Sequence, residues 1–99
     1  MSEGTGTLEI TTSHMPGSVA QEAVNPTIEI DGQPQQGRWG VNTVVVTPGQ
    51  HTVKAYHRWL LFKEAYASST TVDVEEGQTV RLMWHTGAAA FKPAEWSVL

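Results

Sequence analysis

One stretch of the sequence decides the fold: residues 51–59 read HTVKAYHRW. Its odd-numbered side chains from Val53 through Ala55, His57 and Trp59 are mostly apolar or aromatic, whereas the even-numbered ones carry hydroxyl, amine or guanidinium groups. A period of two places successive side chains on opposite faces of a β-strand. The stretch therefore predicts a long strand whose odd-numbered face lies in a core and whose even-numbered face meets solvent.

Similar alternation recurs along the chain and predicts the other strands. They are expected at residues 7–12, 27–31, 41–47, 68–74 and 79–85, and the connections at 33–40 and 93–99 can each hold a short edge strand. Asp31 with Gly32, and Pro48 with Gly49, are turn signals between strands. Short strands at this spacing, without helical periodicity between them, predict one domain over residues 1–99. We expect it to be all-β, an immunoglobulin-like antiparallel β-sandwich of about six to eight short strands.

The expected core consists of side chains that share a parity within each strand. Its members are Leu8, Ile10, Ile28, Ile30, Val53, Ala55, Val72, Val74, Val80, Leu82 and Trp84. The segment 13–26 holds Pro16, Gly17 and Pro26 and is expected to form a loop between the first two strands.

Composition excludes several classes of function. The chain has 99 residues, no cysteine and a net charge of −4, so we expect neither disulfides nor thiolate zinc sites nor a nucleic-acid partner. No apolar run approaches the roughly 20 residues that span a bilayer, and no signal peptide is visible. The expected location is cytoplasmic by default, or envelope-associated if the chain is cut from a longer protein.

The four histidines raise the question of a metal site. His51 and His57 share a strand face but lie about 20 Å apart on an extended strand, and His57 and His85 are expected on opposite faces. His57 has core parity, where a hydrogen bond to the backbone is its expected role. His51 follows a Pro-Gly turn and is expected to close that turn by a hydrogen bond. We expect no metal ion and no cofactor.

A catalytic arrangement is equally hard to find in the sequence. There is no Gly-x-Ser-x-Gly elbow, and the adjacent Ser13 and His14 would face opposite ways on a strand. Glu9 and Glu29 have outward parity and do not converge on a cleft. We therefore expect that the protein is not an enzyme.

Two surfaces are candidates for interaction. The first is the outward face of the long strand, with Thr52, Lys54, Tyr56 and Arg58. If Arg81, Met83 and His85 lie on a neighbouring strand, the two rows form a basic, partly aromatic sheet surface that attracts an anionic partner. The alternative is an ordinary solvated sheet face.

The second candidate surface is the run Trp59, Leu60, Leu61 and Phe62. Four large apolar residues in succession cannot all face one core on a strand. Residues 19–24 or residues 91–96 can cover those that face away, and we favour the C-terminal segment with at least one of the four left partly exposed. If neither segment covers them, the run is a contact site.

Residues 28–84 resemble the PEGA domain family. The matching pieces are IEIDG at 28–32, Gly37, VVVTPGQHTV at 44–53 and VDVEEGQTV at 72–80. Small actinobacterial proteins with the same middle section are similar as well. The chain differs from the family pattern at Arg38-Trp39-Gly40 and by the apolar run at 59–62. The resemblance implies a small sandwich without catalytic residues, often attached to envelope, surface-layer or signalling proteins.

These features together predict a non-catalytic β-sandwich accessory domain that mediates protein–protein interaction. The candidate interaction surface comprises Lys54, Tyr56, Arg58, Trp59, Leu60, Leu61 and Phe62. The alternative is a carbohydrate or cell-envelope binding module, suggested by the resemblance and by four tryptophans and two tyrosines whose rings can stack on sugars. The expected partner is another protein, with polysaccharide as the alternative, and the expected state is a monomer or a weak homodimer.

Overall fold

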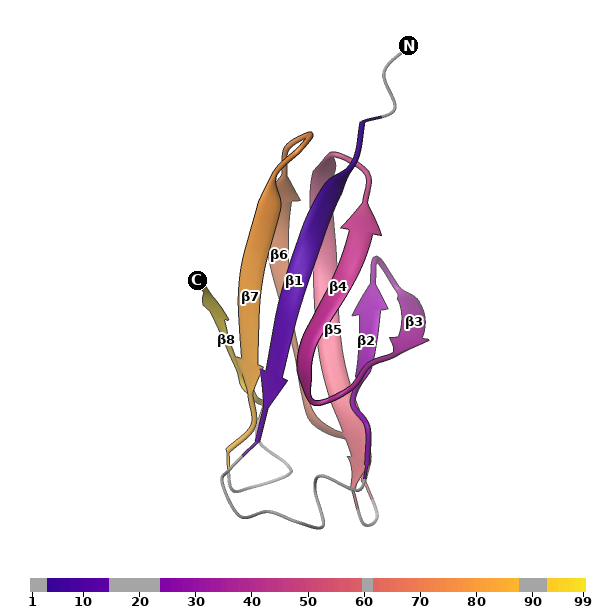
Figure 1. Cartoon of the computed structure of the whole chain (residues 1–99). Coiled ribbons are helices and arrows are strands. Elements are labelled where there is room, and N and C mark those ends of the chain that lie inside the picture. Colours follow the sequence, from indigo (N-terminus) through magenta and orange to yellow (C-terminus); the bar gives the residue numbers. More distant parts are fainter. Residues whose placement is uncertain (1–3, 15–23, 60–61, 88–92) are drawn as a thin grey trace.

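The computed structural model describes residues 4–14, 24–59, 62–87 and 93–99. Eight strands in that part of the chain form two four-stranded sheets packed face to face (Figure 1). The strands are β1 (Gly6–Ser13), β2 (Thr27–Ile30), β3 (Gln33–Gln36), β4 (Gly40–Val46), β5 (Gly49–Trp59), β6 (Phe62–Val74), β7 (Thr79–His85) and β8 (Glu95–Val98). The predicted all-β sandwich is therefore confirmed.

The strand order is β4-β1-β7-β8 in the first sheet and β3-β2-β5-β6 in the second. The neighbours β1 and β7 are parallel, and the other paired strands are antiparallel. The first sheet is therefore mixed, because its two central strands run in the same direction. Among the described residues, no helix has the length and apolarity needed to cross a membrane.

The core lies between the two sheets and follows the predicted parity. Nine of the predicted residues are buried, and Ile30 and Val80 are half-buried and packed against them. Trp84 is fully buried, and its Nε1–H donates to the Ser68 hydroxyl at 3.1 Å. Four further hydrophobic residues are buried with them among the described residues: Val46, Ala65, Tyr66 and Ala94.

Strand β6 begins at Phe62, six residues earlier than the alternation predicts. The register with β5 shifts twice, between Ala55 and His57 and again between His57 and Trp59. Each shift places two residues of β6 opposite one of β5, which is a β-bulge. Tyr66 lies in the first bulge with φ of +59°, in the left-handed region. The bulges break the period of two, so the sequence pattern misses the first half of this strand.

The β2–β3 hairpin forms at the predicted Asp31–Gly32 turn. Both residues have positive φ, +52° and +85°, as a type I′ turn requires. The Asp31 carboxylate accepts a 2.9 Å hydrogen bond from the Thr52 N–H, which ties this turn to β5. The hairpin is therefore anchored at its tip, and β3 extends from it as the edge strand of the second sheet.

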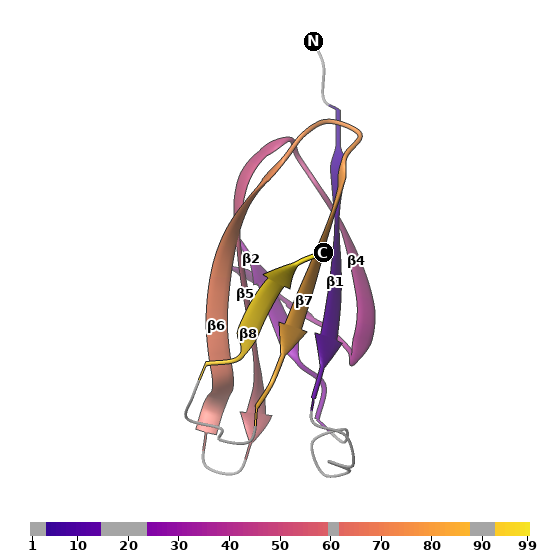
Figure 2. The same ribbon diagram turned by 90° about the vertical axis from the view of Figure 1, so that its left-hand side faces the viewer.

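The order of strands gives the sandwich two different lateral sides. One side carries the edge strands β3 and β4, and the other carries β6 and β8. In Figure 1, β2 and β3 lie beyond the free edge of β4. In Figure 2, β8 lies between β6 and β7.

Candidate functional site

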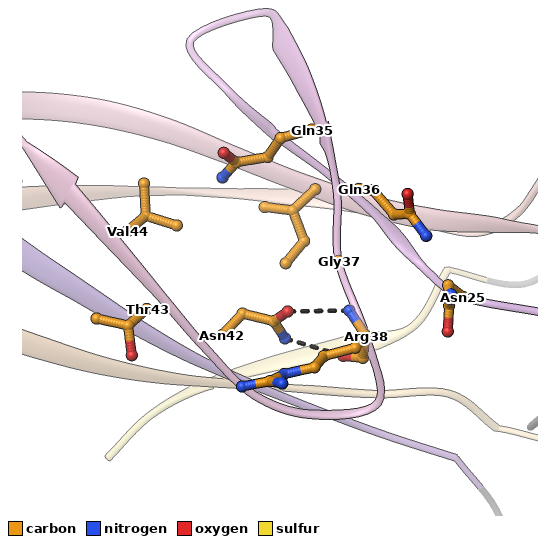
Figure 3. Close-up of a pocket in the computed structure, with 9 residues that line it drawn as sticks. Asn25, Gln35, Gln36, Gly37, Arg38, Asn42, Thr43 and Val44 are labelled. Carbon is orange, nitrogen blue, oxygen red and sulfur yellow. Dashed lines mark hydrogen bonds between the residues drawn. The ribbon is translucent and has the colours of Figure 1, made fainter.

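An open groove of about 460 Å³ lies between β3 and β4 (Figure 3). Its floor includes Ile28 of β2, and its walls come from both edge strands and from the connection between them. Most of its lining is polar and able to donate and accept hydrogen bonds. The lining residues are Asn25, Ile28, Gln35, Gln36, Gly37, Arg38, Asn42, Thr43 and Val44.

The connection after β3 is held close to the core by Gly37. The N–H of Gly37 donates to the Pro26 carbonyl at 2.8 Å. A Cβ at this position would lie 3.0 Å from Ile28 Cδ1 and 3.1 Å from the Pro26 oxygen, so a side chain does not fit without a shift. Glycine therefore allows the close approach that shapes the floor of the groove, and it is one of the residues of the PEGA resemblance.

The next residues are fixed by Asn42. Its Oδ1 accepts from the Arg38 N–H at 2.9 Å, and its Nδ2 donates to the Arg38 carbonyl at 3.0 Å and to the Ile10 carbonyl at 3.2 Å. The Arg38 Nε–H donates to the Val41 carbonyl at 3.3 Å. These bonds set the start of β4 and hold the Arg38 side chain along the groove, as Figure 3 shows.

One wall of the groove is the free edge of β4. The Thr7 N–H donates to Gln78 on the β7 side, so the odd-numbered backbone groups of β1 face β7 and the even-numbered ones face β4. The register pairs Leu8 with Val44 and Ile10 with Asn42. The remaining residues of β4 therefore direct their N–H and C=O groups away from the sheet. They are Val41, Thr43 and Val45.

Within the part of the chain that the structure describes, this edge lacks the usual protection against pairing. Natural edge strands are protected by charges, prolines, bulges or a covering segment. Strand β4 reads GVNTVVV and has no charge and no proline, and Val41 and Val45 are 47% and 67% exposed. By contrast, β3 reads QPQQ and carries Pro34 in its middle. The backbone of β4 is thus the better template for a further strand.

A second hollow of about 800 Å³ adjoins the first and shares Asn25, Gln35 and Gln36 with it. Its other lining residues are Val24, Thr27, Pro34 and Arg58. The described residues that line the two hollows include two arginines and no carboxylate. This is a local positive region on a chain of net charge −4.

The condition for a two-row basic surface is not met. Strand β5 lies in the second sheet and β7 in the first, so Arg81, Met83 and His85 are not beside Lys54 and its neighbours. Strand β7 pairs with β1 instead.

On the outward face of β5 itself, charges are largely compensated. The Lys54 ammonium lies 2.9 Å from Glu64 Oε1 and 5.2 Å from the centre of the Tyr56 ring. The Tyr56 hydroxyl donates to Glu29 at 2.8 Å, and this bond raises the pKa of Tyr56 to about 12. Arg58 is exposed and belongs to the second hollow. Of the predicted basic row, Arg58 alone lines either hollow.

The apolar run is only partly described. Trp59 and Phe62 pair through their backbones where β5 meets β6. Their side chains, and Leu60 and Leu61 entirely, lie outside the described residues. Each of the two predicted covering segments is described only in part. Of residues 19–24, only Val24 is described, and its carbonyl accepts a 2.9 Å hydrogen bond from Trp39 Nε1. Of residues 91–96, Pro93 to Trp96 are described, and Ala94 is buried.

His51 links two turns. Its Nδ1 lies 2.6 Å from Asp31 Oδ2, and its Nε2 lies 2.6 Å from the Thr47 carbonyl. Both partners accept hydrogen bonds, so the ring is favoured in its doubly protonated form. The bonds to Asp31 and Thr47 raise the pKa of His51, and the bond to His51 lowers the pKa of Asp31. The predicted turn-closing role is confirmed, and Asp31 is an additional partner.

His57 is fully buried among aromatic rings. The ring centres of Trp39 and Tyr66 lie 5.5 Å and 5.2 Å from its own, and its Nδ1 lies 3.0 Å from the Arg58 carbonyl. Burial lowers its pKa. The predicted backbone hydrogen bond is confirmed. In the described part of the chain, no three histidine, aspartate or glutamate side chains are placed to share a metal ion.

A serine–histidine contact that the sequence did not indicate joins β1 to β7. The Ser13 hydroxyl oxygen lies 2.7 Å from His85 Nδ1, because the parallel register places these two residues side by side. Both lie at the outer face of two central strands, whose backbone N–H groups are used by the sheet. The hydrogen bond links the ends of β1 and β7.

Comparison with protein-family models, with curated proteins and with solved structures finds no match to this chain. The resemblance to PEGA domains therefore stays a prediction. The groove was not predicted from the sequence. The sequence features that could have pointed to the groove are the amide-rich segment QPQQ at 33–36 and the uncharged segment VNTVVV at 41–46.

Proposed function

We propose that this domain is a non-catalytic protein-binding module that takes an extended peptide segment as an additional strand along the free edge of β4. The observation that carries the proposal is the position of the groove. It runs beside Asn42, Thr43 and Val44, next to the backbone groups that β4 directs away from its sheet. Addition of a strand to such an edge is an established mode of peptide recognition.

The space beside β4 suits a single added strand. Since β3 and β2 lie beyond the edge of β4, a strand in the groove would pair with β4 on one side and pack over Ile28 and Gln35 below (Figures 1 and 3). Main-chain bonds to Thr43 would supply affinity with little dependence on sequence. Side chains on the outer face of the added strand would cover Val41 and Val45, which are exposed without it.

A carbohydrate is the second candidate ligand, favoured by the amide side chains Asn25, Gln35, Gln36 and Asn42 in the lining. Amides donate and accept hydrogen bonds as sugar hydroxyls require. Sugar sites commonly add an aromatic platform, and the described residues of the lining include no aromatic side chain. Among the described tryptophans, Trp84 is fully buried, and Trp39 and Trp96 pack against the core. A peptide therefore fits the lining better than a sugar.

The test is selection from a random peptide library, followed by titration of the selected peptides into two proline variants. In Thr43→Pro the lost N–H faces the groove, so we expect binding to fall by about tenfold or more while stability stays within about 1 kcal/mol. In Val44→Pro the lost N–H belongs to the β1 ladder, so this variant should lose stability instead.

Two results would contradict the proposal. One is undiminished binding of selected peptides to Thr43→Pro, which would place them elsewhere. The other is failure to select any peptide while a neutral oligosaccharide binds and perturbs the amides of Gln35 and Asn42, which would favour the carbohydrate ligand.

A further inference from the structure

We infer, on the basis of the proposed function, that the segment bound along β4 is acidic and that Arg38 holds a carboxylate near its C-terminal end. The charge of the site points to this chemistry. Among the described residues, the lining of the two adjoining hollows includes Arg38 and Arg58 and no acidic side chain, although acidic residues outnumber basic ones in the chain by 10 to 6. The two arginines attract an anionic segment to this side.

Arg38 is placed in advance for such a contact. Its backbone N–H and carbonyl are both bonded to the Asn42 side chain, and the Thr12 hydroxyl donates to the same carbonyl at 2.6 Å. Its Nε–H donates to Val41, which orients the side chain along the start of β4. Within the described residues, no carboxylate lies at ion-pair distance from this guanidinium. Its terminal nitrogens can therefore bind an incoming carboxylate as a fork.

The direction of the added strand follows from the position of Arg38. Antiparallel pairing is the commoner arrangement of neighbouring strands. A strand antiparallel to β4 ends beside the residues with which β4 begins, and Arg38 bonds to Val41 at that end. The carboxylate in question is therefore either an acidic side chain near the end of the bound segment or its C-terminal carboxylate.

Arg81 provides a matched control, because it lies on β7 in the sheet that contains β4. It is exposed on the outer face of β7, with its Nε 3.6 Å from Glu9 Oε1, and it does not line the groove. Arg81→Gln removes the same charge from the protein as Arg38→Gln. A loss of affinity in Arg38→Gln alone separates a local contact from a change in net charge.

The experiment uses short N-acetylated peptides of alternating threonine and valine in three forms. One ends in an amidated glutamate, one in an amidated glutamine, and one in glutamine with a free carboxylate. Each is titrated into the full chain and its Arg38→Gln and Arg81→Gln variants, with amide shifts followed by NMR. We expect at least one carboxylate form to bind about fivefold more tightly than the amidated glutamine form, with the difference lost in Arg38→Gln and kept in Arg81→Gln.

The form that gains affinity identifies the source of the carboxylate. Equal affinity for all three peptides, with shifts along β4, would overturn the inference and leave the proposed function standing. Absence of shifts along β4 with every peptide would count against the proposed function itself. A polygalacturonate oligomer is titrated in parallel, and Arg38-dependent binding of this oligomer with no peptide binding would overturn the inference in favour of an acidic glycan.

Discussion

The two lateral sides of this sandwich end in different ways. On the β6 and β8 side, the Ala94 N–H donates to the Tyr66 carbonyl at 3.1 Å, so the chain just before β8 covers β6 at its first bulge. On the β3 and β4 side, the corresponding space between the sheets is an open groove. The first side is closed by the chain itself. On the second, the outward backbone groups of Thr43 and Val45 have no strand partner among the described residues, and the Val41 carbonyl accepts from Arg38.

The closed side tolerates strained backbone. Tyr66 holds φ of +59°, a conformation that costs a bulky residue about 1–3 kcal/mol. The strain is offset because the Tyr66 side chain is buried against His57 and its carbonyl meets Ala94. Beyond the bulges, the outer edge of β6 also has no strand partner among the described residues. The Thr52 carbonyl accepts from the Asp31 N–H, so the even-numbered backbone groups of β5 face β2 and the odd-numbered ones face β6. The backbone groups of Ser69, Thr71 and Asp73 therefore point away from the sheet. The side chains of these three residues are polar, unlike the valines of β4.

The largest expected effect lies on the closed side. Replacing Tyr66 by alanine removes a buried ring and keeps the strained φ, so we expect a loss of about 3–5 kcal/mol of unfolding free energy. Tyr66→Gly removes the same ring but relieves the strain and should be more stable than the alanine variant by about 1 kcal/mol. Urea denaturation measures both changes. The role given to strain fails if the alanine variant is the more stable of the two.

Val45→Ala is the matched change on the open side. Val45 is 67% exposed, so its truncation should change the unfolding free energy by less than about 0.5 kcal/mol. A loss comparable to that of Tyr66→Ala would mean that the β4 edge is covered in the free protein and is not open to a ligand.

An intermediate effect is expected at the floor of the groove. In Gly37→Ala the new methyl group would meet Ile28 and the Pro26 oxygen at about 3 Å, so the connection after β3 must move. We expect a loss of about 1–3 kcal/mol in urea denaturation, together with amide shifts at Gln36 and Asn42. Unchanged stability and an unchanged spectrum would show that the floor of the groove is not tightly packed.

The smallest expected effects are those of pH, and they have opposite signs at two histidines. Burial lowers the pKa of His57 in the folded state, so its contribution to stability is lost as pH falls below about 6.5. The bonds to Asp31 and Thr47 raise the pKa of His51, so its contribution is full below about 6.5 and is lost as pH rises through the raised value. The lowered pKa of Asp31 adds a further loss as pH falls below about 3.8.

Measuring the free energy of unfolding by urea at pH values below and above 6.5 separates the contributions of the two histidines to stability. His57→Leu should flatten the decline below about pH 6.5, and His51→Asn should flatten the decline above about pH 6.5. If either substitution instead steepens its own limb, the corresponding direction of the pKa shift is wrong.

The strands and the core could be predicted because both depend on local alternation. Residues such as Ile28, Val53 and Leu82 are buried where their parity places them. The first half of β6 was missed because bulges around Tyr66 interrupt the period of two. Local pattern carries no information about the order of strands in a sheet. The parallel pairing of β1 with β7, which joins residues far apart in sequence, therefore could not be foreseen.

The groove depends on that same missing information. Asn42 and Gln35 become neighbours of one hollow only because β4 and β3 are edge strands of different sheets on the same side. The sequence indicated that residues 33–40 can hold an edge strand, but nothing in residues 41–46 identifies that strand as an edge or places the two segments side by side. For the same reason, the sequence could not decide whether the Lys54 row and the Arg81 row are neighbours, and the structure places them in different sheets.

The most direct test of strand addition is amide hydrogen exchange in the presence and absence of a selected peptide. We expect the outward N–H groups of Val41, Thr43 and Val45 to become protected on binding, while those of Ser69, Thr71 and Asp73 on β6 keep their free rates. Protection on β6 with none on β4, or a bound peptide that protects neither edge, would contradict recognition at the β4 edge.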